Sequence, residues 1–157
     1  MIPVADIVAI AQEVAPDVDP HLVTALALIE SSGNPYQYKY EPDYRWTNLN
    51  FSHPGLMSTS TEIMGQKISW GLMQVMGGTA RFCGFKGWFP ELIDPKTGIR
   101  WGIEYIKWLK ARYTHLEDVI SAYNAGHPTW KSSDGNIGYV KRVMAKMDEL
   151  KRGLLDD

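Results

Sequence analysis

The sequence predicts a mainly α-helical single domain that contains one long irregular segment. Most of the 157 residues fall into apolar patterns of helical period, and Gly and Pro separate these patterns from one another. Residues 36–60 differ, because they are rich in aromatic and polar side chains and carry few helix signals. A chain of this length favours one domain, which we take to span 1–157.

The first two helices are expected at 4–14 and 20–31. Asp19 can cap the second helix, and Pro20 occupies its first position, which is a favoured start. This helix is apolar on nearly every side, as in a helix at the middle of a core. Glu30 ends the apolar run "LALIE", and the chain breaks directly after it through "SSGNP". Such surroundings disfavour a charged carboxylate, so we expect the pKa of this group to be raised.

The remaining elements are also expected to be helical. They are a helix that begins near Ser60 or Thr61, a buried helix over 71–85 that stops at Gly84, the longest helix at 95–113, a shorter helix after it, and a last helix at 136–151. Thr114 and Glu117 predict a capping box for the shorter helix. Trp101, Tyr105 and Trp108 form a stripe opposite the core-facing isoleucines of the longest helix, either for packing or for a sugar or partner surface.

Composition argues against several classes of function. The formal net charge of −2 lacks the basic footprint of a nucleic-acid-binding protein. Neither an apolar run of about 18 residues nor a secretory signal pattern is present, so we expect no membrane insertion. The four histidines are scattered without the spacing of metal ligands, so we expect no metal and no cofactor. One cysteine excludes an internal disulfide, and we expect a monomer.

The chemistry that fits best is cleavage of a glycosidic bond. A carboxyl group that keeps its proton at neutral pH can act as a general acid on the leaving oxygen. Aromatic rings offer flat faces to sugars, and the amides of Gln74, Asn124 and Asn34 offer donors and acceptors. From the residues alone, however, Glu30 could instead be a capping or salt-bridged glutamate.

Five motifs occur in one order along the chain: "ESSGNP", "GLMQVMGGTA", "DPKTGIRWGIEYI", "AYNAG" and "YVKRVM". With these motifs the sequence resembles the soluble lytic transglycosylase (SLT) domain, a lysozyme-like α+β fold that is related to goose-type lysozyme. The resemblance covers about residues 20–147. The small size, without a wall-binding module, suggests a phage-type member.

The resemblance implies a peptidoglycan lytic transglycosylase. Such an enzyme cleaves the β-1,4 bond between N-acetylmuramic acid and N-acetylglucosamine and leaves a 1,6-anhydro end. Glu30 would be the single general acid and base, with no metal and no cofactor, and glycan strands would be the binding partner. The matching positions would place Met73 and Gln74 beside the acid, Tyr123 in a hydrogen bond near its carboxyl group, Asn124 on the same wall, and Ser31 directly after the acid.

The sequence departs from the family pattern between its first two motifs. An inserted loop at about 36–68 separates Glu30 from the "GLMQ" motif, and Ile68-Ser69 replaces the usual Gly-Ala. Ser69 could therefore stand in for the family's substrate-binding serine. We expect the insertion to build part of the substrate groove. Its candidate stacking residues are Tyr36, Tyr40, Tyr44 and Trp46.

The insertion also leaves two alternatives open. Glu62 could act as a second acid that activates water, which would make the protein an inverting muramidase. A module that binds peptidoglycan without cleaving it is an alternative of another class. Since no signal peptide is seen, we expect synthesis in the host cytoplasm and action on the cell wall after release, by holin- or virion-dependent delivery or through a secretion apparatus.

Overall fold

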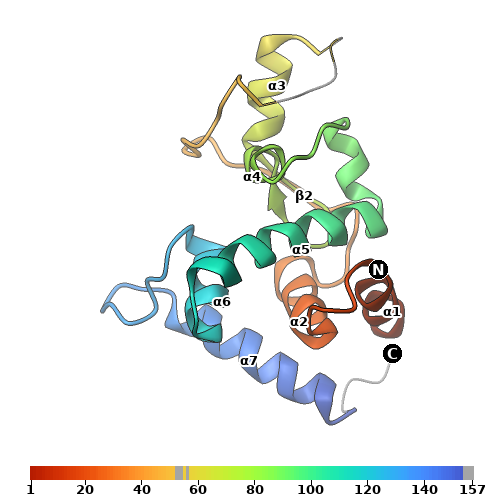
Figure 1. Cartoon of the computed structure of the whole chain (residues 1–157), viewed down its shortest axis with the longest axis vertical. Helices are drawn as coiled ribbons and strands as arrows, with labels where there is room; N and C mark the ends of the chain where they lie inside the picture. The colour runs from red at the N-terminus through yellow and green to blue at the C-terminus, as the bar shows by residue number, and fades with distance from the viewer. Residues whose placement is uncertain (52–54, 56, 154–157) are drawn as a thin grey trace.

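The long helix α5 (Pro95–Arg112) crosses the middle of the molecule, and the other elements are arranged around it (Figure 1). The structure is a computed structural model that describes residues 1–51, 55 and 57–153. The other elements are α1 (Val4–Val14), α2 (Pro20–Ser31), β1 (Tyr38–Tyr40), α3 (Thr59–Gln66), β2 (Ile68–Trp70), β3 (Val75–Met76), α4 (Gly77–Phe82), the 3-10 helix η1 (Phe89–Ile93), α6 (Leu116–Ala125) and α7 (Ile137–Lys151). This architecture confirms the predicted, mainly helical fold.

Local capping signals position the two helices that matter most for the site. Asp19 accepts a hydrogen bond from the backbone N–H of His21 at 2.9 Å at the start of α2. Asp94 accepts one from the backbone N–H of Thr97 at 2.9 Å at the start of α5. In both helices a proline follows the cap, where its missing N–H costs no hydrogen bond. The predicted bounds of α1, α2, α5 and α7 are accordingly confirmed to within about one residue.

The prediction of a single helix over 71–85 is wrong. Gly71 and Gln74 both adopt positive φ, so the chain turns there and then forms β3 and the six-residue α4. A Cβ at position 71 would lie 2.2 Å from the carbonyl oxygen of Leu92, so only glycine fits this close approach. The predicted capping box of Thr114 and Glu117 is wrong as well, because the N-cap of α6 is His115 and makes no capping bond through its side chain.

Three short strands form an antiparallel sheet in the order β1-β2-β3. Tyr38 lies opposite Trp70, and Tyr40 lies opposite Ile68, so that the segment after α2 is held along β2. The strand β2 in turn pairs with β3, with Ser69 opposite Met76. This small sheet joins the inserted segment to the turn that carries Gln74.

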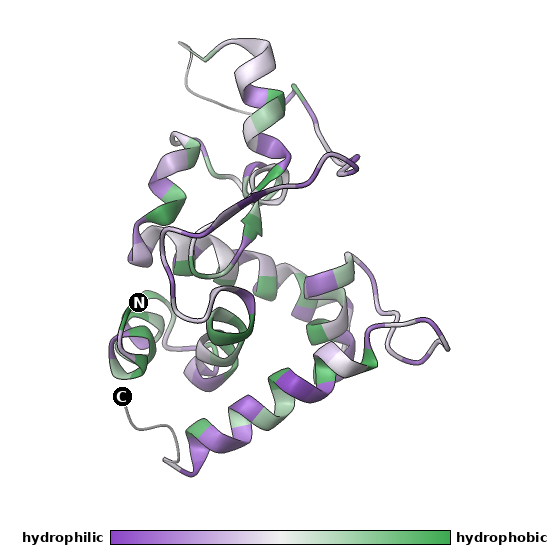
Figure 2. Cartoon of the chain, turned by 180° about the vertical axis from the view of Figure 1, so that it is seen from behind, coloured by the Kyte–Doolittle hydropathy of each residue, from purple (hydrophilic) through white to green (hydrophobic). Residues whose placement is uncertain are grey.

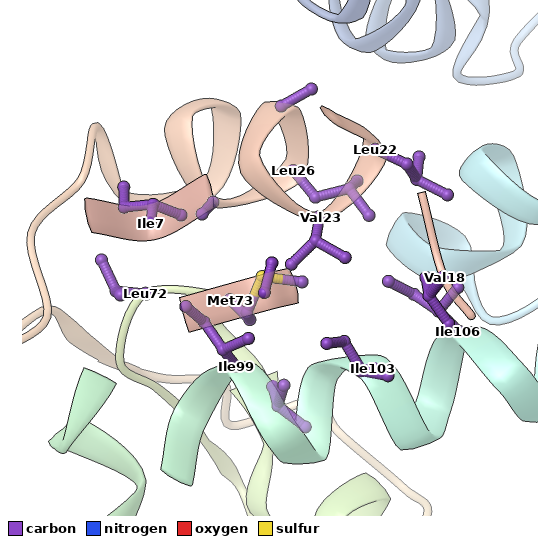
Figure 3. Close-up of a cluster of buried hydrophobic side chains, with 14 of the residues drawn as sticks. Ile7, Val18, Leu22, Val23, Leu26, Leu72, Met73, Ile99, Ile103 and Ile106 are labelled. Carbon is purple, nitrogen blue, oxygen red and sulfur yellow. The ribbon is translucent and has the colours of Figure 1, made fainter. Parts of the chain in front are cut away.

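The main core lies between α1, α2, α5 and the turn before β3 (Figure 3). Its central side chains are fully buried or nearly so: Ile7, Val18, Leu22, Val23, Leu26, Leu72, Met73, Ile99, Ile103 and Ile106. The predicted burial of α2 on nearly every side is confirmed. Figure 2 shows α7 alternating between hydrophobic and hydrophilic positions, as expected of a helix with one buried face. Within the described residues, no helix has both the length and the apolar character that crossing a bilayer would require.

Candidate active site

Glu30 lies in the last turn of α2, at the point where the helix ends. Ser32 adopts a left-handed conformation and its N–H bonds to the carbonyl of Leu28, which closes the helix. Gly33 continues with a positive φ and turns the chain away. Glu30 is therefore carried on a buried helix but contributes to the wall of an open groove.

The groove has a volume of about 1220 Å³. It is lined by residues from the end of α2, the segment 37–51, the strands β2 and β3, the helices α4 and α5, and the end of α6. The inserted segment therefore supplies a large part of the lining, as the sequence predicted.

The carboxyl group of Glu30 accepts a hydrogen bond from the hydroxyl of Tyr139 at 2.5 Å. Burial raises the pKa of Glu30, and this effect outweighs the bond from Tyr139 and the charge of Arg142, which both favour the carboxylate. Burial and the neighbouring carboxylate also raise the pKa of Tyr139, so its hydroxyl stays protonated and donates. A protonated acid with a fixed donor beside it suits proton transfer in either direction.

Tyr123 lies close to Glu30 and Tyr139, but its hydroxyl donates a hydrogen bond to a different residue. Its hydroxyl donates to the carbonyl oxygen of Met73 at 2.7 Å, whereas the hydrogen bond to the Glu30 carboxyl itself comes from Tyr139. Burial raises the pKa of Tyr123, and the charge of Glu30 raises it further. The Met73 side chain is fully buried in the core, so only its backbone serves the site.

Gln74 lies on the groove lining in a left-handed conformation. Its amide nitrogen donates to the carbonyls of Gln37 at 3.0 Å and Gly71 at 2.9 Å. Its amide oxygen accepts a bond from the hydroxyl of Ser69 at 2.9 Å. Gln74 thus links β2, the turn at Gly71 and the start of the insertion by hydrogen bonds.

The comparisons with known proteins show the family and the fold. The model of the Transglycosylase SLT domain family matches residues 7–142. This chain belongs to that family. No curated protein matches the sequence. The crystal structure of the 70 kDa soluble lytic transglycosylase SLT70 from Escherichia coli is similar in fold, with a TM-score of 0.64 and 20% identity. The match covers 94% of this chain but only 24% of that chain.

The remaining predicted residues of this SLT domain fall into two groups. Asn124 lines the groove, and its side-chain oxygen accepts a bond from Asn136 at 3.0 Å. Ser31 is buried instead, and its hydroxyl donates to the carbonyl of Ala27 at 3.0 Å. Ser31 therefore bonds within its own helix and does not line the groove.

Tyr36 and Tyr40 do not line the groove, although Tyr44 and Trp46 do. Strand geometry explains Tyr40. Side chains alternate along β1, and Lys39 faces the groove, so Tyr40 points to the other side of the sheet. Tyr36 is 71% exposed, and Tyr40 is 51% exposed.

Glu62 also lies away from the groove, in a buried pair with Arg81. Its two oxygens accept bonds from Nε and Nη2 of Arg81 at 2.9 and 3.1 Å. The same carboxylate accepts a bond from Gln66, whose amide also bonds both the N–H and the carbonyl of Asn48. A carboxylate with these partners is not placed to activate water in the groove, and the prediction of Glu62 as a second acid is wrong. We call Arg81, Glu62 and Gln66 the clasp.

Sequence reasoning missed Tyr139. The motif "YVKRVM" supported the family resemblance, and it contains the tyrosine that bonds Glu30. Tyr105 and Trp108 line the groove, while Trp101 packs on Phe85, so the predicted aromatic stripe divides between the two suggested uses.

Among the described residues, no group of three or more His, Cys, Asp and Glu side chains could hold a metal.

Proposed function

We propose that this SLT domain is a peptidoglycan lytic transglycosylase with Glu30 as its general acid and base. The observation that carries the proposal is a carboxyl group whose pKa burial raises, placed on an open groove and held by the Tyr139 hydroxyl. The groove also offers aromatic rings and amides, which suit N-acetylated sugars.

The reaction takes place in two proton transfers. Glu30 donates its proton to the oxygen between N-acetylmuramic acid and N-acetylglucosamine as that β-1,4 bond breaks, and the acetamido group of the substrate stabilises the cationic carbon. The carboxylate so formed is stabilised by the Tyr139 hydroxyl. Glu30 then removes the proton from the C6 hydroxyl, whose oxygen closes the 1,6-anhydro ring. Glu30 is protonated again at the end.

A muramidase that uses water is the second candidate, because the groove contains other carboxylates. Glu41 is 2.7 Å from Lys39, and Asp43 has no ion pair among the described residues. An inverting enzyme requires a base about 6.5–9.5 Å from the acid. The raised pKa of Glu30 fits both reactions, so the products must decide between them.

The experiment is mass spectrometry of the fragments that the protein releases from purified peptidoglycan. Fragments that lack one water and end in 1,6-anhydro-muramic acid support the transglycosylase. Reducible muramic ends would instead establish the hydrolase, and the absence of any release would favour the binding module.

Replacement of Glu30 by Gln is expected to lower the release about 10²- to 10⁴-fold, because only the transferable proton is lost. The matched control is Glu13→Gln, which removes an exposed carboxylate on α1 that does not line the groove. Full activity of Glu30→Gln would contradict the assignment.

A further inference from the structure

Two arginines line the groove and form no ion pair with a carboxylate among the described residues. They are Arg45, from the inserted segment, and Arg112, the last residue of α5. Lys39, the other strong cation of the lining, is neutralised by Glu41 at 2.7 Å. Within the described part of the chain neither arginine forms an ion pair, not even with Asp43, which also lines the groove. Their charges remain available to a ligand.

Arg112 is oriented by an aromatic platform. Its guanidinium carbon lies 4.6 Å from the centre of the Trp108 ring. Trp108 is itself fixed between Tyr105, with ring centres 6.1 Å apart, and Phe82, at 5.2 Å. A guanidinium that lies against an aromatic face keeps the N–H donors at its edge free, and these match the two oxygens of a carboxylate.

A purely structural explanation is that Arg112 only complements the partial negative charge at the C-terminus of α5. Lys110 lies in the same last turn and can do the same, yet it neither lines the groove nor rests on a ring. Both residues can therefore interact favourably with the C-terminus of α5. Only Arg112 also lines the groove and lies against the Trp108 ring, and the helix end does not explain these two features. We therefore relate them to the binding of a ligand.

We propose that Arg112, oriented by Trp108, binds a carboxylate carried on the muramic-acid side chain of the glycan strand. The inference rests on the proposed function, since it assumes that a glycan strand occupies the groove. The carboxylate can come from the stem peptide or, where the peptide has been removed, from the lactyl group. Arg112 would then select strands that carry an acid on their side chains over uncharged polysaccharides of similar shape.

The test is isothermal titration calorimetry on the Glu30→Gln protein, with and without Arg112→Gln, so that strands bind without being cut. The probes are strands with stem peptides, strands freed of peptides, both strands with their carboxyls converted to amides, and a hexamer of N-acetylglucosamine. We expect Arg112→Gln to weaken binding about 2- to 5-fold for at least one of the unmodified strands, as for an exposed ion pair worth up to about 1 kcal/mol. The strand that responds identifies the source of the carboxylate.

Binding of the amidated strands and of the hexamer should not respond to the substitution. Lys110→Gln is the matched control for net charge and should change none of the affinities. Arg112→Lys should lose most of the effect, because an ammonium group keeps the charge but not the planar fork. An equal loss of affinity for the charged and the uncharged probes, or no loss of affinity for any probe, would overturn the proposal. A strand that binds through Arg112 but is never cut by the wild type would refute the proposed function alone.

Discussion

The two sides of the groove are built by different means. The side that carries Glu30 rests on an apolar core between α1, α2 and α5, which holds its position by close packing (Figure 3). The side contributed by 41–51 is mostly exposed and is held by polar contacts, chiefly the clasp and the bond from Lys67 to the carbonyl of Pro42 at 2.9 Å. Packing tolerates small changes of shape, whereas a hydrogen-bonded clasp fixes one particular segment in one place.

The largest expected effect lies at the charged centre of the clasp. Arg81→Met would leave the buried charge of Glu62 without the guanidinium beside it, and we expect a loss of about 3–5 kcal/mol in the free energy of unfolding. Urea denaturation measures this value. The double variant Arg81→Met, Glu62→Met removes both charges and should recover much of the loss. A double variant no more stable than the single one would show that the pair is not what holds this side.

The matched change on the other side is Leu22→Ala. Leu22 is 2% exposed in the main core, and its truncation is expected to cost about 3 kcal/mol through lost burial and a cavity. The substrate KM of the folded protein should stay the same, because Leu22 does not line the groove. Thermal melting together with steady-state kinetics checks both parts. A large rise in KM would mean that the two sides are coupled through the core.

Compared with Leu22→Ala, Gln66→Leu is expected to lower the stability less and to weaken substrate binding more. It removes the bonds to both backbone groups of Asn48, at a cost of about 1–3 kcal/mol. Because Asn48 and its neighbours line the groove, KM should rise several-fold while kcat changes less. Gln66→Glu keeps the acceptor for the Asn48 N–H and serves as the comparison. An unchanged KM at reduced stability would make the clasp purely structural.

The smallest expected effect concerns the pH dependence. Tyr139→Phe removes a donor that favours the charged form of Glu30, so the pKa of Glu30 should rise further. The first step needs the protonated acid, so activity falls as pH rises through this pKa, and the descending limb should move to higher pH. The rate at the optimum should fall about tenfold, since the carboxylate formed in the reaction loses its donor. A limb that moves to lower pH would contradict this account.

Local signals in the sequence were enough for much of the fold. The Asp-Pro pairs at 19–20 and 94–95 fix the starts of α2 and α5 through contacts within a few residues. The turn at Gly71 could not be predicted in this way, because its glycine is required by the carbonyl of Leu92 in a distant segment. The apolar composition of this segment predicted a helix, but the close contact with Leu92 requires a turn at Gly71.

The residues of the site also divide into those with a local sequence signal and those without one. The position of Glu30 at the end of a buried helix could be predicted, since burial and the break after it are both local. Its partner Tyr139 lies 109 positions away, and Arg81 lies 19 positions from Glu62, so neither pairing has a local signal. For the tyrosines of the insertion, the sequence does not say which of the two faces of β1 meets the groove.

The left-handed backbone at Gln74 has a consequence for directed evolution. A positive φ is costly for glutamine and easy for glycine or asparagine, so either substitution would relax the backbone. The same substitutions would remove or shorten the amide that joins Gln37, Gly71 and Ser69. Relief of the backbone is worth about 1–2 kcal/mol, whereas the three lost hydrogen bonds cost about 0.5–1.5 kcal/mol each, so selection for heat resistance is expected to retain Gln at this position, as selection for lysis would.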